Sequence, residues 1–100
     1  MTEQERIDSI EAFTKMFYEQ ESIKGSKTWD KLSRNEIEYL RDSTINLLRS
    51  ICNAGLMKGR WLYENVIHGD WDNTSDNERK VCIDASITMQ EVLRSERDII

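Results

Sequence analysis

The stretch HGDWDNTSDNE, residues 68–78, contains the residue types most typical of a chemical site. With Asp70 as the first ligand, its oxygen-bearing side chains follow the alternate spacing of a calcium-binding loop. The pattern fails at two essential positions, because Ser75 stands where glycine is needed and Val81 where a bidentate glutamate is needed. His68 is the only histidine and has no paired cysteine nearby, so a transition-metal site is not indicated. We therefore expect no metal and no cofactor.

Helix boundaries explain the same stretch. Gly69 is expected to end a short helix, and Ser75 with Glu78 has the capping-box spacing that begins the next one. Asp76 and Glu78 place negative charge in the first turn of that helix, where the helix dipole favours it. Residues 68–78 are therefore predicted to be a junction between two helices.

Catalytic patterns are missing from the rest of the chain. Nucleophilic catalysis needs a serine, cysteine or threonine beside a base, and only His68 offers an imidazole. The sequence has no glycine-rich phosphate loop and no nucleophile elbow. Because 19 of the 100 residues are acidic, neighbouring carboxylates are expected by chance and do not indicate an acid–base pair. The sequence predicts that the protein is not an enzyme.

Length and charge limit the remaining classes. A chain of 100 residues holds a single domain with one core. Its net charge of −5 argues against a general binder of phosphate backbones and fits a protein that binds other proteins. The N-terminal MTEQERIDSI lacks the features of a secretory signal, and no run of eighteen apolar residues exists to span a membrane. Cys52 and Cys82 fit buried thiols in a reducing, cytoplasmic setting, with a disulfide between two helices as the alternative.

Apolar periodicity predicts an all-α fold. Proline is absent and only four glycines interrupt the chain, which suits long helices. We expect a small bundle of three long helices, about 2–24, 33–54 and 76–98, and one short helix, about 57–68, in which Gly59 is a weak point. Ser33 and Glu36 form a capping box at the start of the second, and Gly25 and Gly55 end the first two. The expected buried stripes are Ile7, Ile10, Phe13, Thr14 and Phe17; Ile37, Leu40, Thr44, Leu47, Leu48 and Ile51; and Val81, Cys82, Ala85, Met89, Val92 and Leu93.

Aromatic and surplus apolar residues are the candidates for a binding surface. The three tryptophans, at positions 29, 61 and 71, lie in or beside connecting segments. Each either seals an end of the bundle or is an exposed anchor, since tryptophan is enriched at interface hot spots. Apolar residues outside the stripes are either covered by the short helix or belong to a homodimer or partner interface. The candidate partner-binding residues are Met16, Ile23, Trp29, Trp71, Ile83 and Ile87.

The segment KGSKTWDKLSR, residues 24–34, is the densest in basic residues and contains Trp29. Interleaved cations and aromatic rings can bind nucleic acid, and a second basic group beside Trp61 could join this segment in space. A helix-turn-helix around SICNAGLMKGRW lacks base-reading polar residues on its second helix. Asp30 interrupts the basic run and the chain is acidic, which favours a solvated loop. The candidate nucleic-acid-binding residues are Lys24, Lys27, Trp29, Lys31, Arg34, Lys58 and Arg60.

Together these patterns predict a non-catalytic protein-binding module that docks on a larger protein. Small, acidic, proline-free helical chains resemble in style the accessory and inhibitor proteins that phages and other mobile elements encode against host machinery. The likeness is carried by no motif. A nucleic-acid-binding regulator that uses residues 24–34 is the alternative.

Overall fold

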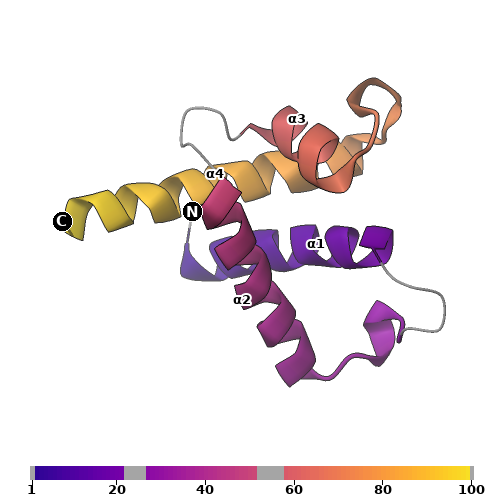
Figure 1. The fold of residues 1–100 in the computed structure, drawn as a ribbon, viewed down its shortest axis with the longest axis horizontal. Helices are drawn as coiled ribbons and strands as arrows, with labels where there is room; N and C mark the ends of the chain where they lie inside the picture. The colour runs from indigo at the N-terminus through magenta and orange to yellow at the C-terminus, as the bar shows by residue number, and fades with distance from the viewer. Residues whose placement is uncertain (1, 22–26, 52–57, 100) are drawn as a thin grey trace.

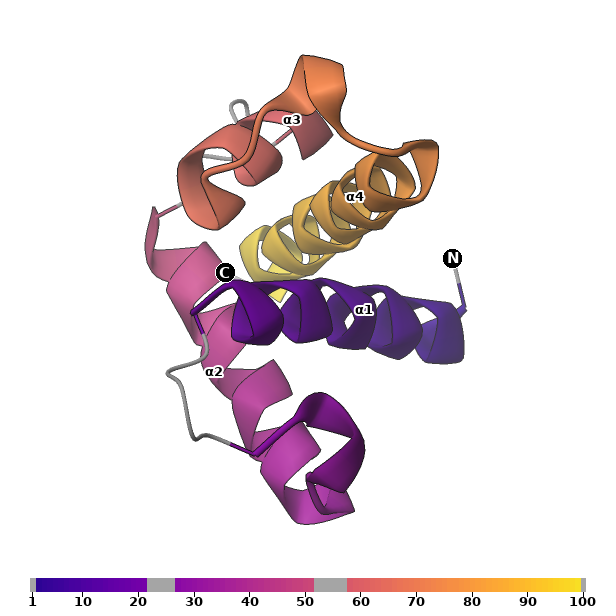
Figure 2. The same cartoon turned by 90° about the vertical axis from the view of Figure 1, so that its right-hand side faces the viewer.

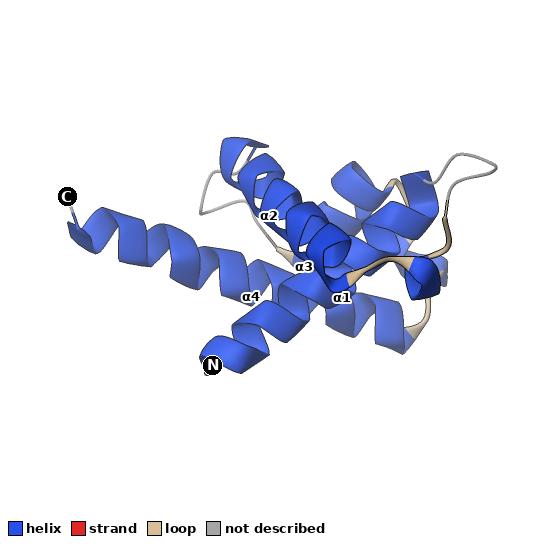
Figure 3. Cartoon of the chain, turned by 90° about the horizontal axis from the view of Figure 1, so that it is seen from below, coloured by secondary structure: helices blue, strands red, loops and turns tan. Residues whose placement is uncertain are grey.

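The described residues form four α-helices and three short helical turns (Figure 1). The structure is a computed structural model that describes residues 2–21, 27–51 and 58–99. Helices α1 (Glu3–Glu21) and α4 (Asp76–Ile99) cross each other, α2 (Arg34–Ile51) lies across them, and the C-terminal part of α4 projects past the rest (Figures 1 and 3). Between α2 and α4 lie α3 (Gly59–Leu62), the π-helical turn η2 (Tyr63–Ile67) and the 3-10 turn η3 (Trp71–Asn73), and the 3-10 turn η1 (Trp29–Lys31) precedes α2.

The all-α prediction is confirmed, and the helix positions agree with it where they are described. The short helix expected at 57–68 is α3 continued by η2, over residues 59–67. The expected ends of the first two helices, at Gly25 and Gly55, lie outside the described residues, as do Ile23, Lys24 and Cys52. Cys82 is a buried free thiol. None of the helices within the described ranges is both long and apolar enough to cross a membrane.

Capping boxes begin two of the long helices. The hydroxyl of Ser33 accepts from the Glu36 backbone N–H, and the Glu36 carboxylate accepts from the Ser33 N–H, both at 3.2 Å. This reciprocal pair is the predicted start of α2. Thr2 and Glu5 form the same arrangement before α1, with both distances at 3.1 Å. Both starts are therefore set by residues three apart in the sequence, which makes them local features.

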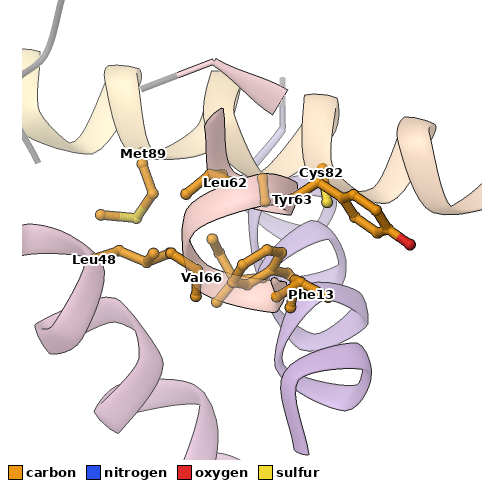
Figure 4. Close-up of a cluster of buried hydrophobic side chains, with 10 residues drawn as sticks. Phe13, Leu48, Leu62, Tyr63, Val66, Cys82 and Met89 are labelled. Carbon is orange, nitrogen blue, oxygen red and sulfur yellow. The ribbon is translucent and has the colours of Figure 1, made fainter. Parts of the chain in front are cut away.

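The core lies where all four helices meet (Figure 4). Phe13 of α1 is fully buried and points toward side chains from α2, from the α3–η2 segment and from α4. The predicted stripe of α2 is wrong at Leu47, which is 37% exposed while Ile45 packs against the core. The side chain of Ile51, also predicted in this stripe, lies outside the described residues. The stripe follows Thr44, Ile45 and Leu48. The buried hydrophobic residues are Ile10, Phe13, Leu48, Leu62, Tyr63, Val66, Ile67, Cys82, Ala85 and Met89.

Polar contacts fix how the long helices cross. The buried hydroxyls of Ser9 and Thr88 lie 2.6 Å apart between α1 and α4, and one donates to the other. One turn away, Arg6 donates to Glu91 at 2.8 Å across the same pair of helices. These contacts pair the N-terminal half of α1 with the C-terminal half of α4, which gives the crossing a specific register.

A charged cluster joins α1 to α2. The carboxylate of Glu11 accepts from Arg41 at 3.2 Å and from Arg34. The side chains of Glu11 and Arg41 are each only 19% exposed, so this pair is shielded from water more than the other surface ion pairs. Arg41 lies one turn before Thr44 and extends the inward face of α2 with a charge. A prediction from the pattern of apolar residues in α2 does not include this ion pair, because arginine is not apolar.

The short helix α3 lies directly on α4. A Cβ atom added to Gly59 would lie 2.7 Å from Ile83 Cγ1 and 2.9 Å from the Ile83 backbone N and Cα. Gly59 begins the helix and Lys58 is its N-cap, so this glycine lies at the start of the short helix and not in its interior. The absence of a side chain at this glycine is what lets α3 reach the α4 backbone.

Candidate interaction surface

The acidic stretch 68–78 forms a polar junction around η3. The Asp70 side chain accepts from the Asp72 backbone N–H at 3.2 Å and from the Asn73 amide, and so caps η3. Ser75 caps α4 by accepting from the Glu78 backbone N–H at 3.2 Å. The Asp70 carboxylate is thus engaged in local hydrogen bonds. Within the described ranges, no three His, Cys, Asp or Glu side chains form a group that could hold a metal ion.

His68, and not Gly69, adopts the left-handed conformation that ends η2. Its φ is 62° and its ψ is 36°, and its backbone N–H donates to the Tyr63 carbonyl. Gly69 also donates to that carbonyl, at 3.0 Å. A Cβ at Gly69 would lie 2.3 Å from the Tyr63 ring, so this glycine is needed for close packing. The prediction that Gly69 ends the helix is therefore wrong by one residue.

Replacing His68 with glycine is expected to stabilise the protein. A left-handed conformation costs a non-glycine residue about 1–2 kcal/mol, part of which the greater freedom of unfolded glycine offsets. We expect the free energy of unfolding to rise by about 0.5–1 kcal/mol, measured by urea denaturation. His68→Ala retains a Cβ and serves as the matched control with no such gain. A destabilised His68→Gly would contradict the assignment of His68 to a strained left-handed conformation.

Glu78 is the centre of a network that holds the junction on the body of the protein. Its carboxylate accepts from the Thr74 hydroxyl and from the Tyr63 hydroxyl, the latter at 2.9 Å. Both hydrogen bonds lower the pKa of Glu78 below its usual 4.5, and the bond from Thr74 has the larger effect on this pKa. The predicted capping box at Ser75 is therefore only half formed, because the carboxylate turns to Tyr63 and Thr74.

Acid is expected to weaken this network. A carboxyl whose pKa is lowered on folding contributes stability above its unfolded pKa, and loses it as the pH falls through the folded pKa. The free energy of unfolding should therefore fall as the pH drops below 4.5. Thr74→Val removes the larger of the two hydrogen bonds and should make this decline shallower in urea titrations at several pH values. Equal slopes for the wild type and Thr74→Val would contradict the assignment.

Trp71 seals this end of the helices. Its ring packs edge-on against Tyr63, with centroids 6.0 Å apart, and the Arg79 guanidinium lies 5.7 Å from its ring centroid. Arg79 also donates to the Trp71 carbonyl at 2.8 Å. Trp71, Trp61 and Met16 all pack against the core. Their contacts favour the sealing role, and the partner-binding role of Met16 and Trp71 stays a prediction.

Two isoleucines form a short ridge on α4. Ile83 is 42% exposed and Ile87 is 40% exposed, as expected for residues outside the buried stripe. The contact of Gly59 on Ile83 shows that the short helix covers part of the ridge. Both residues are less exposed than Tyr39, at 72%, so the ridge is a secondary candidate.

The most exposed of the large hydrophobic side chains described, that of Tyr39, lies at a different surface, which we call the aromatic corner. It consists of Tyr18 at the end of α1, Trp29 in η1, Leu32 directly after η1, and Tyr39 and Leu40 in the first half of α2. Tyr39 is 72% exposed, the highest value among the large hydrophobic residues described. The rings of Tyr18 and Trp29 pack with centroids 5.9 Å apart, and the Tyr18 hydroxyl donates to the Lys27 carbonyl.

Two hollows flank Tyr18 at the aromatic corner. One, of about 370 Å³, is mainly aromatic and aliphatic. The other, of about 240 Å³, lies against Trp29 and carries charged side chains at its rim. The lining residues of the first are Tyr18, Leu32, Asn35, Glu36, Tyr39 and Leu40, and those of the second are Lys15, Tyr18, Glu19, Lys27, Thr28, Trp29 and Asp30.

The basic candidates are divided between two places and are largely paired with acids. Lys27 lies 3.3 Å from Glu36, and Arg34 pairs with Glu11 and Glu38. Figures 1 and 2 place η1 and α3 on opposite sides of α1, so the group at 58–60 does not join the 27–34 segment. Lys58 is exposed beside α3, and Arg60 pairs with Glu64. The expectation of one combined basic patch is wrong.

No family model, curated protein or solved structure matches the chain. What the protein does must therefore be inferred from its own surface. Sequence reasoning selected Trp29 but did not place Tyr18, Leu32, Tyr39 and Leu40 at the same surface. Tyr39 falls outside the periodic stripe of α2, so the criterion of surplus apolar residues would have selected it had tyrosine been counted.

Proposed function

We propose that the protein is a non-catalytic module that binds a larger protein partner through the aromatic corner. The observation that carries the proposal is Tyr39, which is 72% exposed beside a hollow of about 370 Å³. Exposed aromatic side chains next to apolar hollows are typical of interface hot spots. An exposed apolar ring next to an apolar hollow is a surface that a protein partner can cover, and its burial would then favour binding.

The aromatic corner is held in place before any partner arrives. The Tyr18 hydroxyl ties residue 27 to α1, and the Leu32 N–H closes η1 by donating to the Trp29 carbonyl at 3.1 Å. The capping box of Ser33 and Glu36 then fixes the start of α2. A surface that is already ordered loses less conformational entropy on binding, which favours affinity.

The wider role in this proposal is that of an accessory or inhibitor protein acting in the cytoplasm, of the kind that mobile elements encode. Small size and net charge of −5 support it. The buried thiol of Cys82, whose pKa burial raises to about 12, is unreactive and compatible with a reducing compartment.

Affinity capture from the native host lysate tests this function. Tagged wild type should retain a specific protein, identified by mass spectrometry, and should do so equally with and without nuclease treatment. Tyr39→Ala should reduce capture by roughly 30-fold, the effect of losing about 2 kcal/mol at a hot spot. Leu47→Ala, at an exposed apolar position in the second half of α2 and outside the corner, is the matched control and should bind as the wild type does. Equal capture by the two variants would refute the assigned surface.

The nucleic-acid alternative depends on Lys27 and Lys31 beside Trp29. The ion pair of Lys27 with Glu36 and the neighbouring Asp30 reduce the positive potential of this segment. Binding to DNA or RNA that weakens with salt and is lost in the double variant Lys27→Glu, Lys31→Glu would favour this alternative. The protein-binding proposal predicts no binding to either nucleic acid at low salt.

A further inference from the structure

We infer that the partner segment bound by the aromatic corner presents an arginine next to an apolar side chain. The inference rests on the proposed function and adds the chemistry that the corner recognises. The arginine enters the hollow beside Trp29 and pairs with Asp30, and the apolar side chain enters the hollow beside Tyr39. Three features of the described residues support this assignment: an unpaired carboxylate, the aromatic rings beside it, and the different linings of the two hollows.

The linings of the two hollows carry more acids than lysines. Their charged residues are two lysines and three acids, which sum to −1. Both lysines are paired with an acid of the same linings, since Lys15 lies 4.0 Å from Glu19 and Lys27 lies 3.3 Å from Glu36. The third acid is Asp30.

Asp30 carries the excess negative charge of the corner. Its residue is exposed, and its carboxylate forms no hydrogen bond or ion pair within the described residues. Lys31, the next residue in the chain, lines neither hollow and forms no ion pair with Asp30. A cationic group on a partner would therefore complement the charge that is left at this position.

Aromatic rings lie beside this carboxylate. Asp30 follows Trp29 directly in η1, and both residues line the hollow of about 240 Å³ with Tyr18, whose ring packs on that of Trp29. An arginine here can stack its planar guanidinium on a ring while it donates to the carboxylate, whereas the ammonium of lysine is compact and more strongly hydrated. The protein already contains a contact of this kind, because the Arg79 guanidinium lies 5.7 Å from the centroid of the Trp71 ring. Arginine is therefore the cation that this hollow favours.

The other hollow favours an apolar side chain. It has a volume of about 370 Å³, and its lining includes Leu32, Tyr39 and Leu40. Glu36, the charged residue of this lining, is already paired with a lysine. Burial of an aliphatic side chain here removes apolar surface from water, which favours binding. Because Tyr18 lines both hollows, they are adjacent, and a single partner segment can reach both.

The groove between α1 and α4 has more acidic residues but lacks this combination. This groove, of about 300 Å³, contains Glu5, Asp8 and Asp84 beside the cation Lys80, and no aromatic residue among its described lining. Each of the three carboxylates accepts a hydrogen bond from a residue three or four positions earlier in the chain. A cation in this groove would compete with those contacts and would find no ring on which to stack. The corner is therefore the better site for an arginine.

Synthetic peptides test the chemistry of the partner segment. Each peptide has one leucine and one arginine in a glycine–serine host, at several short spacings, and matched peptides have citrulline or glutamate in place of the arginine. Citrulline has nearly the shape of arginine without its charge. NMR titration of the full chain, followed at the indole N–H resonance that Trp29→Phe assigns, should show binding of an arginine peptide and roughly tenfold weaker binding of its citrulline counterpart. Absence of binding by every arginine peptide would overturn the inference, and so would equal binding of the citrulline peptide.

Variants of Asp30 test the residue assigned to the arginine. Asp30→Asn should weaken binding of the arginine peptide by roughly tenfold, and Asp30→Lys should reverse the preference toward the glutamate peptide. Asp76→Asn, at a carboxylate that is 100% exposed in the first turn of α4, is the matched control and should bind as the wild type does. Circular dichroism of each variant checks the fold. A preference for arginine that Asp30→Lys leaves unchanged would overturn the inference.

Capture from lysate separates this inference from the function on which it rests. If a protein is lost from the captured material with Tyr39→Ala but retained in full with Asp30→Lys, the proposed function stands and the arginine assignment is wrong. If the arginine peptide binds as expected and no protein is captured, the recognition chemistry stands and the larger partner is refuted.

Discussion

Gly59→Ala is expected to lower the free energy of unfolding by about 2–3 kcal/mol, because the new methyl group has no space. The added Cβ would lie 2.7 Å from Ile83 Cγ1 and 2.9 Å from two backbone atoms of the same residue. A side-chain tip can rotate away, but the backbone of α4 cannot move without displacing the helix. Relief of the clash therefore requires α3 to move away from α4, which would expose the buried Leu62 of α3.

The sign of this effect separates tertiary packing from helix propensity. Propensity alone predicts that alanine in place of a helical glycine stabilises by up to about 1 kcal/mol. Urea denaturation of Gly59→Ala beside Lys58→Ala, an exposed neighbour expected to change stability by less than about 0.5 kcal/mol, decides between the two. A more stable Gly59→Ala would show that α3 does not rest on Ile83 as described.

Local sequence patterns were sufficient to predict the helices and their described starts. The capping box of Ser33 and Glu36 is formed by residues three apart, so the sequence contains the whole interaction. At Ser75 and Glu78 the same spacing gave only half of the motif, because Tyr63 and Thr74 compete for the carboxylate. Tyr63 lies fifteen residues before Glu78, and no spacing rule connects them.

Contacts between distant segments account for what sequence reasoning missed. The contact of Gly59 with Ile83 and the left-handed His68 depend on how α3 and η2 lie on the rest of the chain. Hydrophobic periodicity reports which face of a helix is apolar, but it does not report how that face is divided between neighbours. Leu47 was therefore assigned to the core, although the inward face of α2 turns toward Ile45.

The aromatic corner was only partly predictable for the same reason. Trp29 attracted attention because tryptophan in a connecting segment is unusual, and its basic neighbours suggested nucleic acid. The fold brings α1 and the start of α2 to either side of η1, and so places Tyr18 and Tyr39 around the tryptophan segment. Ion pairs of Lys27 with Glu36 and of Arg34 with Glu11 then offset part of the positive charge of this surface.

Phe13→Ala is expected to have the largest effect of any substitution considered, a loss of about 3–5 kcal/mol. Phe13 is fully buried where side chains from α2, from the α3–η2 segment and from α4 converge (Figure 4). Truncation removes the transfer free energy of the ring and leaves a cavity that four elements would have to close together. They cannot close it freely, because Ser9 with Thr88 and Glu11 with Arg41 hold α1 in register on either side.

The loss is large relative to the whole stability of a small domain, which is about 5–15 kcal/mol. Urea denaturation should therefore show a midpoint displaced to much lower denaturant, with the steepness of the transition unchanged if the unfolded state is unaffected. Tyr39→Ala removes an aromatic ring of similar size from an exposed position and should cost less than about 0.5 kcal/mol. If the two variants lost equal stability, Phe13 would not lie at the centre of the core, and the arrangement of α3 and η2 around it would be wrong.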